Sequence, residues 1–267
     1  MSAPTKDIAP FENRRSRLTL NNGKDFQELP RGFFVTGTDT GVGKTIIAGA
    51  VVEVLKSLGF HTGVMKPVES GCTRRGNSLV PNDAMLLKRI THADDPISDI
   101  SPSLFESPLA PMAAAEIEKK VVDLGNIKKV FARMSRKYEA LVIEGVGGLM
   151  VPLKKDYYAL DLARDFGFPV IVTARPGLGT INHTLLTVNT AISEGLIVAG
   201  VVINYRHPPL NDLAEETNLT LLPRILPASI AGVFPYIGNP DEVSIAKAAV
   251  TTLDIGLLRK SLELQSA

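Results

Sequence analysis

Short runs of apolar, β-branched and aromatic residues alternate along the chain with longer segments whose apolar positions recur at helical spacing. Each short run is apolar at successive positions, which is typical of strands covered by helices on both faces. The expected strands cover residues 32–37, 61–66, 141–144, 169–173, 197–203 and 230–234. The expected helices cover residues 43–58, 82–90, 112–121, 125–138, 159–166, 180–194 and 241–261. This alternation predicts an α/β fold built on a doubly wound, mainly parallel sheet with helices on both faces.

Two segments depart from the alternation. Residues 94–111 contain four prolines, and we expect them to cross the edge of the sheet as irregular chain. Residues 1–30 lack an apolar signal core and carry several acidic residues, so we expect a mobile extension rather than a signal or transit peptide. A targeting role for Arg14, Arg15 and Arg17 is the alternative. The remaining residues, 31–267, are expected to form a single domain.

The composition is that of an ordinary globular protein. With 45% hydrophobic and 21% charged residues, the chain is not of the disordered, collagen-like or disulfide-scaffold class. Its 29 Lys and Arg against 28 Asp and Glu leave a formal charge of +1, so no overall basic field attracts nucleic acid or an anionic membrane. The longest apolar run, 196–203, is too short to span a bilayer. We therefore expect neither nucleic acid nor a membrane as partner.

The chain has a single cysteine, Cys72. It cannot form an internal disulfide or a cysteine-based zinc site, which favours a packed thiol in a reducing compartment. We accordingly expect a cytoplasmic location.

The clearest chemical motif is GTDTGVGKT, from Gly37 to Thr45, between the first expected strand and the first expected helix. In this context backbone N–H groups and the helix N-terminus bind phosphates, the lysine neutralises them and the threonine hydroxyl reaches Mg²⁺. Five residues separate Gly37 from Gly43, where the strict phosphate-loop pattern has four. The motif is thus a stretched variant, and it predicts a P-loop NTPase-like fold in which Lys44 is solvated until nucleotide binds. The expected ATP-binding residues of the loop are Thr40, Gly41, Val42, Gly43, Lys44 and Thr45.

One position in the loop narrows the class. Partition and septum-placement ATPases of the same superfamily carry a lysine near the start of the loop, and Asp39 stands at that place here. An ATPase that senses its own dimer through this lysine is therefore disfavoured.

Other polar groups follow the expected second and third strands. Lys66 and Ser70 follow one strand and Glu144 ends another, so all three should lie at the carboxyl edge of the sheet, where open α/β sheets bind ligands. A carboxylate on an apolar strand is costly to bury unless it is paired or bound to a metal. Two plainer interpretations stay open: Lys66 as a solvated cation, and Asp83 as the cap of the helix that begins beside it.

Five ordered blocks together resemble the dethiobiotin synthetase family. The blocks are GTDTGVGKT at 37–45, KPVESG at 66–71, NDA at 82–84, EGVGG at 144–148 and GTINHTLLT at 179–187. The resemblance extends from about residue 32 to the C-terminus. It implies an ATP- and Mg²⁺-dependent ring closure, in which 7,8-diaminononanoate and CO₂ give dethiobiotin, ADP and phosphate through a carbamate and a carbamic-phosphoric anhydride.

The resemblance also implies residue roles. Lys44 and Lys66 are the implied catalytic residues, the first on the β- and γ-phosphates and the second on the carbamate. The implied Mg²⁺ ligands are Thr45, Asp83 and Glu144. The implied diamine and carbamate site is lined by Thr40, Lys66, Ser70, Gly145, Val146, Gly147 and Gly148. The adenine site is implied at Asn204, Pro235 and Tyr236.

A further implied site lies at the start of the helix that begins near residue 180. Thr180, Ile181 and Asn182 are expected near a homodimer interface, where free N–H groups bind the substrate carboxylate from the partner subunit. His183 is expected to have a structural or interface role. One departure is Gly41, which stands where some family members carry a loop glutamate.

Two other classes remain as alternatives. An amide- or cobyrinate-type ligase of the same superfamily shares the phosphate loop but usually adds a C-terminal glutaminase domain, for which the sequence after Asn239 is too short. A non-enzymatic nucleotide switch leaves KPVESG and GTINH without a purpose. Dependence of phosphate release on both diaminononanoate and bicarbonate distinguishes these classes.

Overall fold

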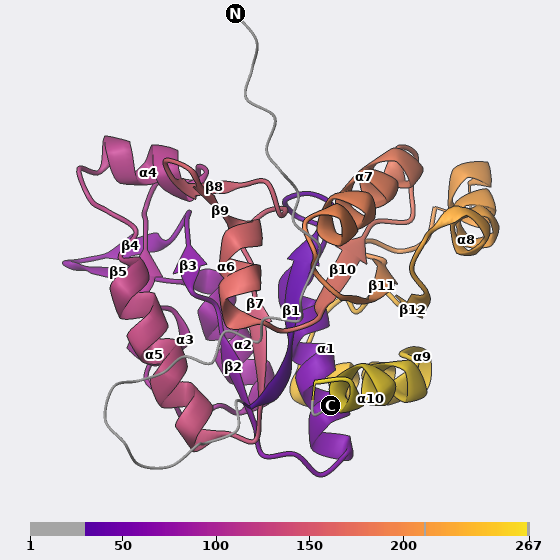
Figure 1. Cartoon of the computed structure of the whole chain (residues 1–267), viewed down its shortest axis with the longest axis horizontal. Coiled ribbons are helices and arrows are strands. Elements are labelled where there is room, and N and C mark those ends of the chain that lie inside the picture. Colours follow the sequence, from indigo (N-terminus) through magenta and orange to yellow (C-terminus); the bar gives the residue numbers. More distant parts are fainter. Residues whose placement is uncertain (1–29, 211, 266–267) are drawn as a thin grey trace, which may run out of the picture.

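Six parallel strands form the central sheet of the computed structural model, which describes residues 30–210 and 212–265. The strand order across the sheet is β12-β11-β10-β1-β7-β2, and all five pairings are parallel (Figure 1). The strands are β1 (Arg31–Gly37), β2 (Thr62–Met65), β7 (Ala140–Glu144), β10 (Val170–Ala174), β11 (Val198–Asn204) and β12 (Ile230–Phe234). The predicted doubly wound parallel sheet is therefore confirmed, and the expected N-terminal extension lies almost wholly outside the described residues.

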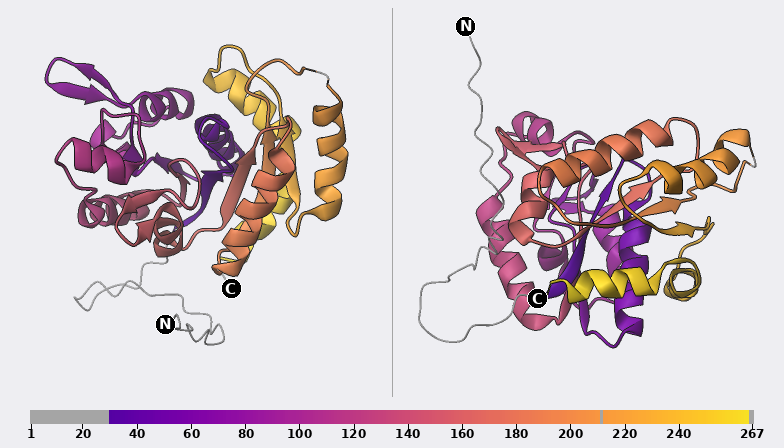
Figure 2. Two further views of the ribbon diagram at one scale, coloured as in Figure 1. Left: turned by 90° about the horizontal axis from the view of Figure 1, so that it is seen from above. Right: turned by 45° about the vertical axis from the view of Figure 1, so that its right-hand side comes forward.

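Helices cover both faces of this sheet. The helices are α1 (Lys44–Ser57), α2 (Asn82–Thr91), α3 (Ile97–Ile100), α4 (Pro111–Ile117), α5 (Leu124–Lys137), α6 (Ala159–Phe166), α7 (Thr180–Ser193), α8 (Leu213–Ile225), α9 (Glu242–Thr252) and α10 (Ile255–Glu263). Successive strand residues point to opposite faces. Phe34 thus joins the core under α4 to α7, while its neighbours Phe33 and Val35 join the core under α1, α2, α9 and α10. Figure 2 shows α1 and α9 on one side of the sheet and α6 and α7 on the other.

The segment between α2 and α4 runs beside the edge strand β2, as predicted, but the expectation that it is wholly irregular was wrong. The N–H of Lys66, one residue beyond β2, donates to the carbonyl of Ile100 at 2.7 Å. The segment contains α3 and the short strand β6 (Ser103–Leu104), which pairs in parallel with β3 (Val68–Glu69). Two short antiparallel pairs complete the strands: β4 (Thr73–Arg75) with β5 (Ser78–Val80), and β8 (Pro152–Lys154) with β9 (Tyr157–Tyr158).

Two expectations about helices were wrong. The single helix expected over 241–261 is two helices, because the N–H of Asp254 donates to the carbonyl of Ala231 and its side chain then caps α10. The sequence pattern also missed α8, which has Pro223 inside its last turn. A start signal was present, since Asp212 caps α8 by accepting from the N–H of Glu215.

Candidate active site

A cleft of about 880 Å³ lies at the carboxyl edge of the sheet. The loops that follow β1, β2, β7, β11 and β12 contribute to it, because parallel strands bring their carboxyl ends to one edge. The residues predicted from sequence that line it are Thr40, Gly41, Gly43, Lys44, Thr45, Lys66, Ser70, Asp83, Glu144, Val146, Gly147, Asn204, Pro235 and Tyr236. The fold thus gathers blocks that are far apart in sequence into one site.

The phosphate loop turns sharply into α1. Gly43 has φ 92°, and a Cβ there would lie 2.0 Å from Nδ2 of Asn204, so only glycine fits. The next residue, Lys44, is 7% exposed, and its Nζ donates to the carbonyl of Asp39 at 2.9 Å. Burial lowers the pKa of Lys44 to about 8, against the opposing effect of Glu144. The expectation that Lys44 is solvated without ligand was therefore wrong: the loop folds back over its ammonium group.

Lys66 lies between two carboxylates. Its Nζ is 2.5 Å from Oε1 of Glu144 and 2.9 Å from Oδ2 of Asp83. Burial by itself lowers the pKa of Lys66, but the two carboxylates hold it above its ordinary value, so the ammonium stays charged. Lys66 is only 3% exposed, which excludes the interpretation as a solvated cation.

The carboxyl group of Glu144 is buried and only partly satisfied. Its Oε1 accepts from Lys66 and, at 3.0 Å, from the hydroxyl of Thr45, whereas its Oε2 has no hydrogen-bond partner among the described residues. Burial raises the pKa of Glu144, and the charge of Lys66 opposes this. An unsatisfied buried carboxylate oxygen is costly and marks a place where a ligand can bind.

The oxygens of Thr45, Asp83 and Glu144 have the chemistry that Mg²⁺ requires. All three residues line the cleft, and Oε2 of Glu144, which no described residue satisfies, is a hard oxygen donor. The described residues contain no cluster of three or more His, Cys, Asp or Glu that could hold a metal. Two carboxylates and a hydroxyl suit Mg²⁺, which usually keeps waters and phosphate oxygens among its ligands.

Asn204, at the end of β11, is hydrogen-bonded to the phosphate loop. Its Nδ2 donates to the carbonyl of Val42 at 2.8 Å, and the side chain is almost fully buried. Since the amide nitrogen is used in this way, Oδ1 remains as its acceptor. Val42 itself is buried and does not line the cleft.

Some predicted residues are not brought into the cleft. Gly145 packs against the ring of Phe34 and Gly148 against the carbonyl of Gly37, so neither lines it. The start of α7 also lies outside, as does the nearby His183, whose Nδ1 is 3.5 Å from Nη2 of Arg175. The first three residues of α7 are Thr180, Ile181 and Asn182. The prediction that they serve the partner subunit stays a prediction.

Glu69 and Arg206 are charged residues that line the cleft and that were not assigned to the site from the sequence. Glu69 lines the cleft and accepts hydrogen bonds from the N–H groups of Asp83 and Ala84. Burial raises the pKa of Glu69 to about 7, although Lys66 and these N–H groups oppose the shift. Arg206 donates from Nη1 to the carbonyl of Gly41 at 2.6 Å, across the phosphate loop. Glu69 stands inside the block KPVESG, and Arg206 stands two positions after Asn204, so each had a local signal in the sequence.

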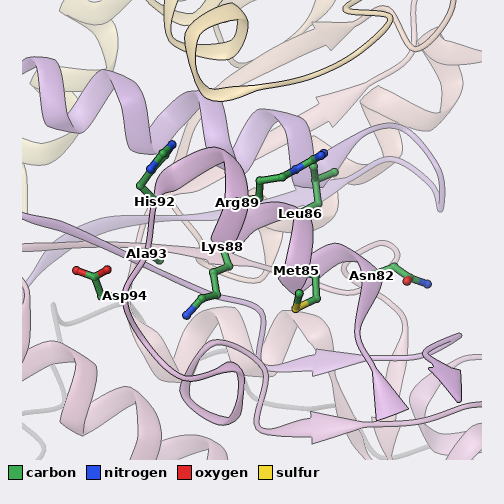
Figure 3. Close-up of a pocket in the computed structure, with 8 residues that line it drawn as sticks. All are labelled: Asn82, Met85, Leu86, Lys88, Arg89, His92, Ala93 and Asp94. Carbon is green, nitrogen blue, oxygen red and sulfur yellow. The ribbon is translucent and has the colours of Figure 1, made fainter. Parts of the chain in front are cut away.

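A second hollow, of about 790 Å³, runs along α2 (Figure 3). It contains none of the predicted site residues. Two of its polar side chains have partners, since Lys88 donates to the carbonyl of Asp95 and Nε2 of His92 is 2.7 Å from Glu242. This hollow therefore offers no unpaired charge from these two side chains to a ligand.

The parallel sheet and the stretched phosphate loop at its carboxyl edge define a P-loop NTPase-like protein. The AAA_26 family model, described as an AAA domain, matches residues 31–243. The ATP-dependent dethiobiotin synthetase BioD of Thermodesulfovibrio yellowstonii is 41% identical, over 86% of this chain and 99% of that protein. The Bacillus subtilis protein of the same name is 39% identical, over 85% and 97%. The chain belongs to the ATP-dependent dethiobiotin synthetase family.

A comparison of structures gives a more distant likeness. The cell-division ATPase MinD of Pyrococcus furiosus has a TM-score of 0.49 and 16% identity, over 87% of this chain and 99% of that one.

Within the described residues, none of the helices has the length and apolar character needed to cross a bilayer.

Proposed function

We propose that this protein forms dethiobiotin from 7,8-diaminononanoate and CO₂ with conversion of ATP to ADP and phosphate. The family to which the chain belongs supports the overall reaction. The observation that carries the residue-level proposal is the position of Lys66, a charged lysine held by two carboxylates in the same cleft as the phosphate loop.

The proposed reaction has three steps. One amine of the substrate adds to CO₂ and loses a proton, which gives a carbamate. A carbamate oxygen then attacks the γ-phosphorus of ATP, and ADP leaves with the electrons of the broken P–O bond. The second amine finally attacks the carbonyl carbon of the resulting carbamic-phosphoric anhydride. Phosphate leaves with the electrons of the broken C–O bond, the attacking amine loses a proton to solvent or to the departing phosphate, and the ureido ring closes. No side-chain nucleophile is needed, so positioning and charge neutralisation dominate.

Lys66 and Lys44 are the proposed catalytic residues. Lys66 holds the carbamate anion and stabilises charge that develops on the transferred phosphoryl group. Lys44 exchanges its contact with the Asp39 carbonyl for the β- and γ-phosphate oxygens. Its lowered pKa supports this role: burial outweighs the opposing effect of the nearby carboxylates, so an incoming polyanion would stabilise the ammonium group further.

Thr45, Asp83 and Glu144 are the proposed ligands of Mg²⁺. Mg²⁺ supplies neutralisation of phosphate charge when it is bound. Oε2 of Glu144 supports this assignment, since it has no hydrogen-bond partner in the described part of the chain and needs a cationic or protic one.

Asn204, Pro235 and Tyr236 form the proposed adenine site. The Asn204 amide nitrogen donates a hydrogen bond to the carbonyl of Val42, and the amide oxygen stays available as an acceptor. We propose that this oxygen accepts from the amino group of adenine. The rest of the proposed ATP site is the loop from Thr40 to Thr45.

The proposed diamine site extends from the phosphate loop to the loop after β7. Thr40, Ser70, Val146 and Gly147 line the cleft and support it. We propose that Gly145 and Gly148 shape this loop without contacting substrate. The start of α7, at Thr180, Ile181 and Asn182, is proposed to bind the substrate carboxylate of the partner in a homodimer. A single domain over residues 31–267 and a cytoplasmic location complete the proposal.

An ADP-release assay with and without each substrate tests the function. We expect ADP release to require both diaminononanoate and bicarbonate, and mass spectrometry to find the label of ¹³C-bicarbonate in the ureido carbon of dethiobiotin. Steady ADP release without the diamine would instead indicate a nucleotide switch. Release that requires an amide-nitrogen donor would indicate a ligase of the amide-forming class.

A further inference from the structure

We propose that Glu69 is a positioning residue, whose carboxylate holds the first turn of α2 so that Asp83 faces Lys66. The inference rests on the proposed function of the cleft and extends it to a residue that acts through another.

The start of α2 has no cap from its own segment. Its N-cap residue is Pro81, and no side-chain hydrogen bond from this segment satisfies the first N–H groups. Glu69, which belongs to β3, supplies the missing acceptors. Its Oε1 accepts from the N–H of Asp83 at 2.8 Å and its Oε2 from the N–H of Ala84 at 3.0 Å. The interpretation of Asp83 as the helix cap was therefore wrong, because the cap comes from another strand.

The two hydrogen bonds connect directly to the cluster around Lys66. The residue whose N–H is held, Asp83, is the residue whose carboxylate lies 2.9 Å from Nζ of Lys66. The Asp83 side chain is 47% exposed, so little packing fixes its position. Glu69 is only 3% exposed, so packing around it restricts the position of its carboxylate. Its backbone is held as well, because the N–H of Phe105 donates to its carbonyl at 2.9 Å.

A second route from Glu69 to the site must be separated from positioning. The charge of Glu69 also acts on Lys66 through space. That route does not involve Asp83, whereas positioning acts only through it. A double-mutant cycle between residues 69 and 83 distinguishes the two routes, because effects transmitted through a shared residue are not additive.

The test compares Glu69→Gln, Asp83→Asn and the double variant in the full chain. Glu69→Gln keeps the size of the side chain but can accept only one of the two hydrogen bonds. We expect it to lower kcat about tenfold and to raise the half-saturating Mg²⁺ concentration, with little change in the KM for ATP. In the Asp83→Asn background, the same substitution should change kcat less than twofold. Mg²⁺-dependent binding of ADP, measured by calorimetry, repeats the cycle without turnover.

The control removes a helix cap away from the cleft. Asp123 caps α5 by accepting from the N–H of Asn126 at 2.9 Å. Asp123→Ala should lower Tm, while kcat and the Mg²⁺ dependence stay within twofold of the original protein. If Glu69→Gln does not fold, Glu69→Asp takes its place in the cycle, since it keeps the charge and shortens the reach.

Equal effects of Glu69→Gln with and without the Asp83 carboxylate would overturn the proposal, as would a loss of Tm with unchanged kcat and Mg²⁺ dependence. Failure of the proposed function looks different. In that case the unsubstituted protein forms no dethiobiotin, and the ADP-binding cycle still tests whether Glu69 acts through Asp83.

Discussion

The ammonium group of Lys66 donates to Oε1 of Glu144 at 2.5 Å, across 78 residues of sequence. The pair is buried, and Glu144 keeps its second oxygen without a partner among the described residues. Glu144 would be one of the ligands that hold Mg²⁺ in the proposed site, and Lys66 would hold the proposed carbamate, so this one contact joins two proposed roles. Substitutions of Glu144 and of Lys66 should therefore have different effects.

Substitution of Glu144 by glutamine should weaken the response to Mg²⁺. Glu144→Gln removes one negative oxygen at nearly constant volume, while Asp83 still pairs with Lys66 and maintains the fold. We expect the half-saturating Mg²⁺ concentration to rise about tenfold or more, as for other changes near metal sites. A Mg²⁺ titration of ADP release measures this. An unchanged titration curve would show that Glu144 is not a metal ligand.

Substitution of Lys66 should separate binding from chemistry. Lys66→Ala leaves Lys44 and the loop N–H groups in place, so calorimetry should find ADP affinity within a few-fold of the original. Loss of the charge beside the carbamate should lower kcat by about 10²-fold or more. Lys66→Arg should restore little, because a planar guanidinium does not fit the place of a compact ammonium between Glu144 and Asp83.

Two measurements on Lys66→Ala test this prediction: the single-turnover rate of dethiobiotin formation and the equilibrium affinity for nucleotide. Weakened ADP binding with a preserved single-turnover rate would assign Lys66 to the nucleotide site and contradict the proposed role.

Removal of the Lys44 charge should stop turnover without unfolding the protein. Lys44→Met keeps the buried aliphatic chain and removes an ammonium whose pKa burial lowers to about 8. The unfolded chain keeps the ordinary value of 10.5 and binds more protons between pH 8 and 10.5, so the charged lysine destabilises the ligand-free protein below pH 8. We expect ADP formation to fall at least about 10²-fold and the ligand-free Tm at pH 7 to rise. ADP production with the original KM for ATP would contradict this.

Glu118 should make the stability of the protein depend on acid pH. Burial alone raises the pKa of Glu118, but hydrogen bonds from Lys120 and from the N–H of Ser107 lower it to about 2. Because the folded value lies below the ordinary 4.5, the stabilisation is complete above pH 4.5 and is lost as pH falls towards 2. Glu118→Gln should therefore cost stability at pH 7 and less at pH 3. Urea unfolding at both pH values measures the difference, and an equal loss at both would refute the assignment.

Tyr138→Phe should destabilise the fold without affecting catalysis. The Tyr138 hydroxyl donates to the buried carboxylate of Asp95, which also pairs with Lys137 at 2.6 Å. Loss of this donor should lower the free energy of unfolding by about 1–2 kcal/mol, with kcat unchanged. Lys128→Ala, which breaks the more exposed pair with Asp165, should cost less than about 1 kcal/mol and serves as the control. A change in kcat for Tyr138→Phe would link this cluster to the cleft.

The sequence by itself determined the parts of the protein that depend on near neighbours. The apolar runs predicted the six strands of the parallel sheet, because strands covered on both faces need apolar residues at successive positions. The phosphate loop was also recognisable, since its glycines, Lys44 and Thr45 all lie within nine consecutive residues. Lys66, Asp83 and Glu144 were singled out because each stands at the end of a strand or the start of a helix and lies in a block that resembles the family.

Tertiary structure decided the contacts between segments distant in sequence. The support of α2 by Glu69, the bond from Arg206 to Gly41 and the bond from Asn204 to Val42 arise only when parallel strands bring their carboxyl ends together. The break between α9 and α10 has the same cause, because Asp254 pairs with β12. Local pattern carries no information about such partners: a hydrogen bond between distant residues depends on strand order and register, which the packing of both helical layers sets.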